Sequence, residues 1–421
     1  MNRRRSASRV MARPEPTGIG ALVLLACTAV LLVAAGPLAG QDLLVRGAQV
    51  MTMSEQGTLE SGDVLIRDGR IAQVGHGLSA PAGVRVLEGD GWVIMPGMID
   101  CHSHMTTQLE RGGGSDRHER GQRVNTGLRI LDAVNPAYGW LVPGALAGGV
   151  TTLHVMPGSN ASFGGQTLLL KAVEKPTVDE MLVREPVGMK MSMGATRGAG
   201  TSEMREWFTK GQEYLESLSR WEEGDGSGRE PRRDLQLEGV GMQLTGEIQT
   251  HTHAQRAIEM QYALKMAREF GLDLVLHHAF DGWKIADDIQ RQDQVSVCFG
   301  PIVHSFANDH LWTPGILSEM GVKVALNMDS ASSFQRHLLH SVQIAVRYGM
   351  DPMEGLRSVT TNPAEMLGVG ERLGSLEEGK DGDLVVLDGD PLSTFTNVLY
   401  TVVDGEVVYD RDVHGDLGVT R

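Results

Sequence analysis

Cysteines and basic runs are both scarce in this chain of 421 residues. The formal net charge is -15, and no run rich in Lys or Arg follows the first fourteen residues, which argues against a nucleic-acid partner. Of the three cysteines, removal of an N-terminal leader would leave Cys101 and Cys298. We expect these two on non-neighbouring strands, where a disulfide would need backbone movement, and interpret both as small buried hydrophobes.

Long apolar runs are also rare, and the clearest one extends from Ala21 to Ala35, broken only by Thr28. Small residues follow it from Gly36 to Gly40, and five arginines precede it, at Arg3, Arg4, Arg5, Arg9 and Arg13. This order predicts a signal peptide over residues 1–40 and therefore an exported protein, periplasmic or extracellular. An uncleaved signal or a lipid anchor on Cys27 is the alternative, and either would tether the chain to a membrane.

A glycine-rich phosphate turn, which doubly wound sheets use to bind nucleotides, is missing as well. Apolar strands instead alternate with amphipathic helices, as in the helix expected at Ala254–Phe270 and the strand expected at Leu272–His278. Strands that are apolar on both faces indicate a parallel sheet covered by helices. We therefore predict an α/β protein with a (β/α)8 TIM-type barrel over residues 96–374, with an insertion at residues 196–234.

Both ends of the chain carry short β segments instead. Asp68-Gly69 and Asp404-Gly405 each separate two such segments and predict hairpins with tight turns. Neither end is large enough to bury a core alone. Residues 41–95 and 375–421 are therefore predicted to form one small β-sandwich domain together.

A His-x-His pair closes the first strand of the predicted barrel, in Pro96-Gly97-Met98-Ile99-Asp100-Cys101-His102-Ser103-His104. Because side chains alternate along a strand, His102 and His104 should project to the same side. Two imidazoles that converge in this way supply half of a metal site. A pair of surface histidines in a loop is the alternative, so partners from other strands must decide.

Other predicted strands also end on metal-binding residue types. The candidates are His154, Lys190, His251, His253, His278 and Asp329. Each has an ordinary alternative: His154 and His253 could be hydrogen-bonded core residues, and Lys190 could extend outward from an edge strand. Active sites of such barrels gather at the carboxyl ends of the strands. The coincidence of several candidates there favours a site for Zn, Mn, Fe or Co over calcium.

These motifs resemble the amidohydrolase superfamily, in its imidazolonepropionase-like and prolidase-like branch. The resemblance covers nearly everything after the leader and rests on the His-x-His segment, Gly149-Val150-Thr151-Thr152, the later histidines, Asp329, Thr361-Asn362-Pro363-Ala364 and the run from Gly374 to Leu384. It implies that His102, His104 and Asp329 bind a buried metal and that His251 and His278 bind a second one. Lys190 matches a lysine that relatives carboxylate to bridge two ions. Gly194-Ala195 follows where relatives often have two glycines, which leaves one ion or two open.

The implied activity is that of an exported metal-dependent amidohydrolase, with zinc as the expected ion. A metal-activated hydroxide would attack a C–N bond in an amide, a dipeptide or a cyclic amide such as an imidazolone. Asp329 would carry the proton to the leaving nitrogen, and His253 would polarise the carbonyl. The expected partner is a small-molecule substrate, and a homo-oligomer stays open. The alternatives are a metal-free binding or scaffold protein, and isomerase or deaminase chemistry at the same site.

Overall fold

A computed structural model describes residues 42–107, 122–136, 142–194, 197–224, 229–302, 310–329 and 335–415. The predicted signal peptide over residues 1–40 lies outside these ranges. Among the residues described, none of the helices combines the length and the apolar character that a membrane span requires.

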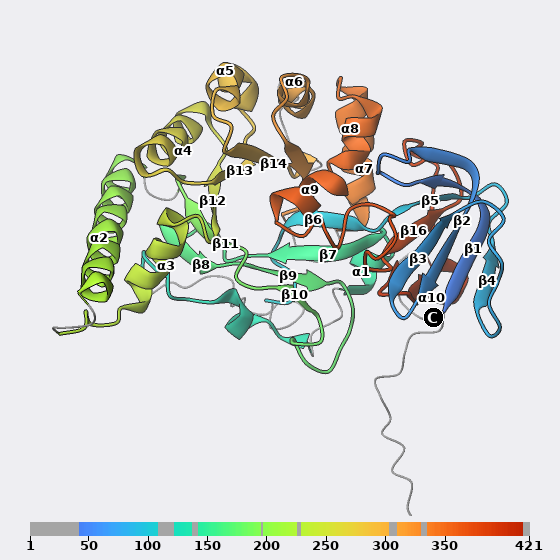
Figure 1. The fold of residues 1–421 in the computed structure, drawn as a ribbon. Helices are drawn as coiled ribbons and strands as arrows, with labels where there is room; N and C mark the ends of the chain where they lie inside the picture. The colour runs from blue at the N-terminus through green and yellow to red at the C-terminus, as the bar shows by residue number, and fades with distance from the viewer. Residues whose placement is uncertain are drawn as a thin grey trace, which may run out of the picture. The chain divides into compact units, whose positions relative to one another are not determined.

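Strands from both ends of the chain form one eight-stranded sheet in the order β18-β17-β16-β5-β1-β2-β3, with β4 paired to β1 (Figure 1). The antiparallel pair of β5 and β16 joins the two ends in this sheet, with Met95 opposite Val385. These strands belong to one sheet in the described part of the chain, so the predicted two-sheet sandwich is not confirmed. The bounds are β1 (Leu43–Met51), β2 (Thr58–Arg67), β3 (Arg70–Gly75), β4 (Arg85–Glu88), β5 (Val93–Pro96), β16 (Leu384–Leu387), β17 (Val398–Val403) and β18 (Glu406–Asp410).

The two Asp-Gly turns form as predicted. Asp68 and Gly69 have φ of 48° and 77°, and Asp404 and Gly405 have φ of 48° and 78°. Positive φ at both central residues is the mark of the primed turn that suits the twist of a two-residue hairpin. The first turn joins β2 to β3 and the second joins β17 to β18.

The middle of the chain carries two further sheets, β10-β9-β7-β6 and β15-β14-β13-β12-β11-β8. Strands β11 to β15 are parallel to one another, and β6 is parallel to β7, as the apolar runs predict. The bounds are β6 (Met98–Ser103), β7 (Val150–Val155), β8 (Phe163–Gln166), β9 (Leu168–Lys171), β10 (Leu182–Arg184), β11 (Gly188–Ser192), β12 (Gln249–Ala254), β13 (Leu274–His278), β14 (Val295–Phe299) and β15 (Val324–Leu326).

One stretch departs from a barrel of parallel strands. Strands β8 and β9 follow each other directly, and β9 is antiparallel to β7 while β8 is antiparallel to β11. Strands β8 and β9 therefore connect the two sheets, and each is antiparallel to the strand that it pairs with in its own sheet. At the opposite edges, Ile99 N donates to Val359 O at 2.8 Å and Leu326 N donates to Ser358 O at 2.9 Å. Strands β6 and β15 thus bond to the same turn, while a ladder that closes the barrel stays a prediction.

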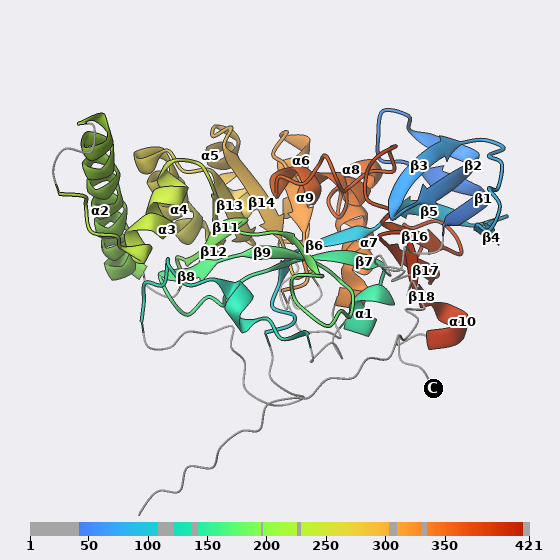
Figure 2. The ribbon, with the colours of Figure 1, turned by 60° about the horizontal axis from the view of Figure 1, so that its bottom comes forward.

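Helices follow the strands and cover them on one side, as α4, α5 and α6 do above β12 to β14 in both views (Figures 1 and 2). Helix α4 ends as predicted at Gly271, which has φ of 69° and forms the left-handed cap that glycine favours. The bounds are α1 (Val142–Leu146), α2 (Arg197–Glu223), α3 (Leu235–Leu244), α4 (Ala257–Phe270), α5 (Ala286–Gln290), α6 (Thr313–Glu319), α7 (Leu338–Arg347), α8 (Pro352–Arg357), α9 (Thr361–Met366) and α10 (Arg411–His414), with 3-10 turns η1 (Ile130–Ala133), η3 (Gly282–Ile285) and η5 (Gln335–His337).

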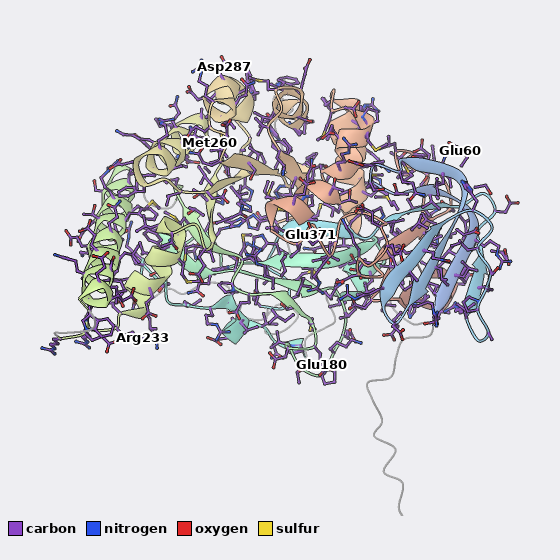
Figure 3. All side chains as sticks on the ribbon, viewed as in Figure 1. Glu60, Glu180, Arg233, Met260, Asp287 and Glu371 are labelled. Carbon is purple, nitrogen blue, oxygen red and sulfur yellow. The ribbon has the colours of Figure 1, made fainter. Side chains whose placement is uncertain are left out.

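Helix α2 occupies most of the predicted insertion. Its Phe208 is buried, stacks on Phe270 of α4 with ring centroids 5.0 Å apart, and meets Phe163 of β8 edge to face. Apolar side chains such as Met260 point inward in the same way, whereas Arg233 and Asp287 are exposed (Figure 3). The helix therefore packs into the core, and its status as an insertion stays a prediction.

A buried ion network connects β9 to the terminal sheet. Lys171 Nζ lies 2.9 Å from Asp383 and 3.0 Å from Asp381, and the three side chains are at most 4% exposed. Arg372 also pairs with Asp381, at 2.7 Å. Opposite charges this deeply buried stabilise each other only while every partner is present.

Candidate metal centre

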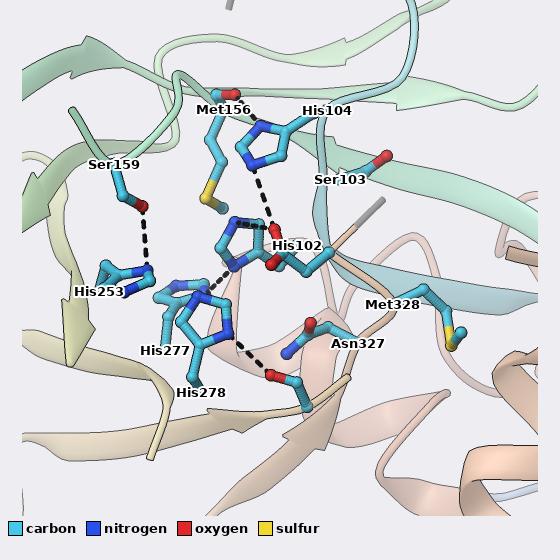
Figure 4. Close-up of polar contacts among 12 residues, drawn as sticks. His102, Ser103, His104, Met156, Ser159, His253, His277, His278, Asn327 and Met328 are labelled. Carbon is cyan, nitrogen blue, oxygen red and sulfur yellow. Dashed lines mark hydrogen bonds and ion pairs between the residues drawn. The ribbon is translucent and has the colours of Figure 1, made fainter. Parts of the chain in front are cut away.

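The predicted ligands on three separate strands converge at the carboxyl ends of those strands (Figure 4). His102 lies near the end of β6, and His104 follows one residue after it. His278 is the last residue of β13, and Asp329 comes three residues after β15. Strands β13 and β15 belong to one parallel series, and β6 brings its two histidines to the same place from the other sheet.

Asp329 lies at the centre of this group. Its Oδ1 is 3.3 Å from His102 Nε2 and 3.2 Å from His104 Nε2. Ligand atoms of His102, His278 and Asp329 all lie within 4.8 Å of one another. The His-x-His pair therefore projects to one side as predicted, with both Nε2 atoms directed at the same carboxylate.

Hydrogen bonds on the far side of two rings fix which nitrogen carries the lone pair. His104 Nδ1 lies 2.8 Å from Met156 O, and His278 Nδ1 lies 2.8 Å from Gly300 O. A carbonyl only accepts, so both Nδ1 atoms donate and a neutral ring has its lone pair on Nε2. His278 Nε2 is buried and has no hydrogen-bond partner among the described residues, and His104 Nε2 faces a carboxylate oxygen.

Two acceptors that face each other repel unless a proton or a cation lies between them. The donor set of imidazole and carboxylate, without cysteine, is the one that zinc and similar ions use. The orphaned His278 Nε2 and the pairing of His104 with Asp329 therefore fit a divalent metal ion.

The backbone at two ligands is unusual. His278 has φ of 74° and Asp329 has φ of 47°, in the left-handed region that non-glycine residues adopt at a cost of about 1–3 kcal/mol. A hydrogen bond of 3.0 Å from Asp329 N to His102 O holds one of these turns in place. Asp100 supports the same region by accepting from the backbone N–H groups of His102 and Met328.

Lys190 reaches the site from β11. Its side chain is 1% exposed, and its Nζ lies 3.1 Å from His102 Nε2 and 3.1 Å from Met156 Sδ. Its strand is buried along its whole length, while the apolar setting inferred from the sequence stays a prediction. The amine thus lies where a ligand derived from it would reach the His102 side of the group.

His251 is buried on β12, and its ring packs against that of His277, outside the group that includes Asp329. Its Nδ1 lies 2.9 Å from His277 Nε2, and its Nε2 has no hydrogen-bond partner among the described residues. The ring lies against Gly188, where an added Cβ would come within 2.6 Å of that Nε2. The structure therefore does not bring His251 Nε2 to the group around Asp329.

His277 is a residue that the sequence did not single out as a ligand or a catalyst. It is fully buried and contacts two predicted ligands, with its Nε2 on His251 and its Nδ1 2.9 Å from His102 Nδ1. Its position next to His278 in the sequence was visible, but simple alternation places neighbours on opposite faces. The left-handed turn at His278 brings both rings to one site.

The two other histidines differ in role. His154 is a core residue whose ring nitrogens are 3.0 Å from Cys101 O and 2.8 Å from Thr167 Oγ1. His253 is partly exposed, its Nδ1 is 3.0 Å from Ser159 Oγ, and its ring centroid is 4.3 Å from that of His278. Only His253 of these two can meet a substrate.

Burial dominates the electrostatics of the site. It holds the pKa of His102, His251 and His277 well below the usual histidine value, and the charge of Lys190 lowers each further. Burial opposes ionisation of Asp329, but the neighbouring His104, His278 and Lys190 hold its pKa below the ordinary range. Neutral imidazoles around an ionised carboxylate are the state in which this set binds a cation.

The two cysteines among the described residues are free and buried, as predicted. Cys101 and Cys298 lie on strands that are not paired with each other, within one apolar cluster. Burial, followed by a hydrogen bond to Cys101, raises the pKa of the Cys298 thiol. Neither thiol is therefore a candidate ligand.

Comparison with known proteins matches residues 281–408 to the model of the amidohydrolase family. A crystal structure of an amidohydrolase from Thermotoga maritima MSB8 has a TM-score of 0.80 and 30% sequence identity, and covers 88% of this chain and 100% of that chain. An imidazolonepropionase of Thermoplasma acidophilum is 26% identical over 382 residues, which cover 85% of this chain and 91% of the relative.

The amidohydrolase tasK of Hapsidospora irregularis is 25% identical over 395 residues, which cover 84% of this chain. The matched region spans 40% of that relative's length. Together these similarities confirm the resemblance drawn from the motifs. Likeness to amidohydrolase structures also implies an α/β fold of the TIM-barrel type.

Proposed function

Because the chain belongs to the amidohydrolase family, we propose that it hydrolyses a C–N bond in an amide, a dipeptide or a cyclic amide, with a divalent metal ion as cofactor. The relatives named amidohydrolase and imidazolonepropionase are hydrolases of C–N bonds and support the bond class. The observation that carries the metal is the 3.2 Å approach of His104 Nε2 to Asp329 Oδ1, in which two acceptors face each other.

The ion, most simply zinc, is held by His102, His104, His278 and Asp329. Once bound, such an ion activates water and polarises a carbonyl group. Lys190 is a further ligand if its amine is carboxylated, because the change would turn a cation beside His102 into an anion. The 3.1 Å distance from Nζ to His102 Nε2 supports this assignment.

Two partly exposed side chains of the site would act on the substrate. The Asp329 carboxylate is 30% exposed, so it can take the proton of the attacking water and return it to the leaving nitrogen. His253 stays neutral because burial lowers its pKa, and as a neutral imidazole it can donate one hydrogen bond to the carbonyl oxygen. The buried histidines would bind and orient without exchanging protons with the substrate.

Two finer parts of the prediction also belong to this proposal. We propose that the strands close into a barrel through Ser358 and Val359, which bond to both β15 and β6. We also propose export, on the basis of the basic and apolar order of residues 1–40.

The test is release of amine or ammonia across dipeptides, N-acyl amino acids, cyclic amides and adenine nucleosides. Purified protein is stripped with a chelator and then reloaded with Zn²⁺. We expect release from the reloaded protein, loss of it in the stripped protein, and loss of it in Asp329→Asn. His340→Gln, which changes an exposed histidine outside the site, is the matched control.

Each other outcome has a distinct meaning. Ammonia from nucleosides alone would assign deamination instead of amide hydrolysis. Equal turnover by stripped and reloaded protein would contradict the role of the metal. Protein that holds and binds no metal would leave a binding or scaffold role as the better account.

A further inference from the structure

Three buried imidazoles form one hydrogen-bonded row beneath the site. His251 Nδ1 lies 2.9 Å from His277 Nε2, and His277 Nδ1 lies 2.9 Å from His102 Nδ1. All three side chains are 0% exposed. His277 therefore uses both of its ring nitrogens on the two histidines that the sequence assigns to different ions.

The protons in this row can be counted. Each of the two contacts needs one N–H and one lone pair, and a neutral imidazole carries one of each. A neutral His277 thus donates to one neighbour and accepts from the other. A protonated His277 would donate to both neighbours. In neither state can it accept from both.

Metal binding sets the opposite requirement. A neutral histidine that binds an ion through Nε2 carries its proton on Nδ1, so its Nδ1 must donate. If His102 and His251 both bound ions through Nε2, both would donate to His277. His277 would then have to accept at both nitrogens, which only an imidazolate could do. The row consequently lets His102 or His251 serve as a ligand, but not both.

The surroundings decide which one. His102 Nε2 faces Asp329 Oδ1 at 3.3 Å within the group of candidate ligands. His251 Nε2 lies against Gly188 instead, and His251 is not part of that group. The proton order is therefore His102 Nδ1–H to His277, His277 Nε2–H to His251, and a remaining N–H on His251 Nε2.

We propose that His277 is a positioning residue that holds His102 in its metal-binding tautomer and, through the same row, excludes His251 as a ligand, so that the centre takes one ion. That ion is bound by His102, His104, His278 and Asp329. The inference rests on the metal site of the proposed function and replaces the two-ion arrangement that the family resemblance implies.

Metal counting tests the proposal without any need for turnover. Metal-free full-length protein is titrated with Co²⁺, and bound ions per chain are measured by equilibrium dialysis together with visible absorption. We expect one ion per chain in the wild type. His251→Gln should keep that ion with its Kd within about threefold, whereas His102→Gln should weaken binding by more than about tenfold.

Substitution at 277 gives the sharper test. His277→Gln keeps one hydrogen-bond acceptor and one donor in the side chain, so this variant should still bind one ion. His277→Glu places a carboxylate that accepts from both neighbours, which frees His251 Nε2 and should admit a second ion. Adding His251→Gln to His277→Glu should then remove that second ion. Circular dichroism establishes that each variant is folded.

Two ions in the wild type, with one lost in His251→Gln, would overturn the proposal. A folded His277→Glu protein that still takes one ion would overturn it as well, and binding of no Co²⁺ by the wild type would overturn it together with the proposed metal. Failure of the proposed function is separate: one ion without turnover contradicts only the activity, and turnover with two ions contradicts only this inference.

Discussion

His104 Nε2 and Asp329 Oδ1 lie 3.2 Å apart while His104 donates from its other ring nitrogen to the Met156 carbonyl. In a neutral His104 this arrangement sets a lone pair against a carboxylate. A cation between the two atoms removes the repulsion and adds two bonds. The same carboxylate oxygen also lies 3.3 Å from His102 Nε2, so one cation could bind to His102, His104 and Asp329 together.

Asp329→Asn should keep the fold and lose most of the turnover. The amide is close in size to the carboxylate but cannot take a proton from water or deliver one to nitrogen. We expect kcat/KM to fall by about 10²–10⁴, with a melting temperature at least equal to that of metal-free wild type. Near-normal rates in this variant would place the proton carrier elsewhere.

Lys190→Ala tests the predicted carboxylated lysine. If the modified side chain is a ligand, the variant should lose affinity for the ion by about 10-fold or more and most of its turnover. Metal content after gel filtration and steady-state rates measure the two effects. Full metal content with wild-type turnover would remove Lys190 from the mechanism.

His154 should make the fold sensitive to acid. Burial lowers the pKa of this histidine from 6.5 to about 3, so between these values the unfolded chain binds a proton that the folded chain does not. The free energy of unfolding therefore falls as the pH drops from about 6.5 toward 3, by up to about 5 kcal/mol from this one residue.

His154→Gln should flatten that part of the pH profile, as urea unfolding at several pH values would measure. Its Co²⁺ stoichiometry should equal that of the wild type, because both nitrogens of His154 are already hydrogen bonded to Cys101 O and Thr167 Oγ1. An unchanged slope between pH 4 and pH 6.5 would argue against a buried neutral His154.

Lys171→Met should destabilise the protein by about 3–5 kcal/mol at pH 8, because Asp381 and Asp383 would lose their buried partner. Burial opposes ionisation of Asp381, but Lys171 and Arg372 outweigh it and lower its pKa below 3.8. The ion pairs of Asp381 thus stabilise the fold above pH 3.8, and this stabilisation is lost as the pH falls through the folded pKa of Asp381. The difference in unfolding free energy between wild type and Lys171→Met should therefore shrink in acid. Lys175→Met, in an exposed pair with Glu406, is the control and should cost less than about 1 kcal/mol.

Much of the fold could be predicted because local patterns agree with it. Asp-Gly turns, the Gly271 cap and the apolar runs of β12 to β14 each have a local physical cause. The antiparallel stretch of β8 and β9 could not be predicted, since a short apolar run such as Leu168–Lys171 carries no information on strand direction. The sequence of the terminal strands likewise predicts which strands pair in hairpins, but it does not show whether these strands form one sheet or two.

The candidate site could be predicted where side chains alternate regularly between the two faces of a strand. His102, His104 and Asp329 meet as the motifs predict, at the carboxyl ends of β6 and β15. His277 was missed because the left-handed backbone at His278 overrides alternation, and this conformation leaves no mark in the residue types. The orientation of His251 likewise depends on its packing against Gly188 from a neighbouring strand.

Anomalous diffraction from crystals soaked in Zn²⁺, collected at the zinc edge, tests the central claim most directly. The account predicts one peak per chain, at about 2.0–2.2 Å from Nε2 of His102, His104 and His278 and from the Asp329 carboxylate. A peak bound through His251 Nε2, or a fully soaked crystal without a peak at Asp329, would contradict it.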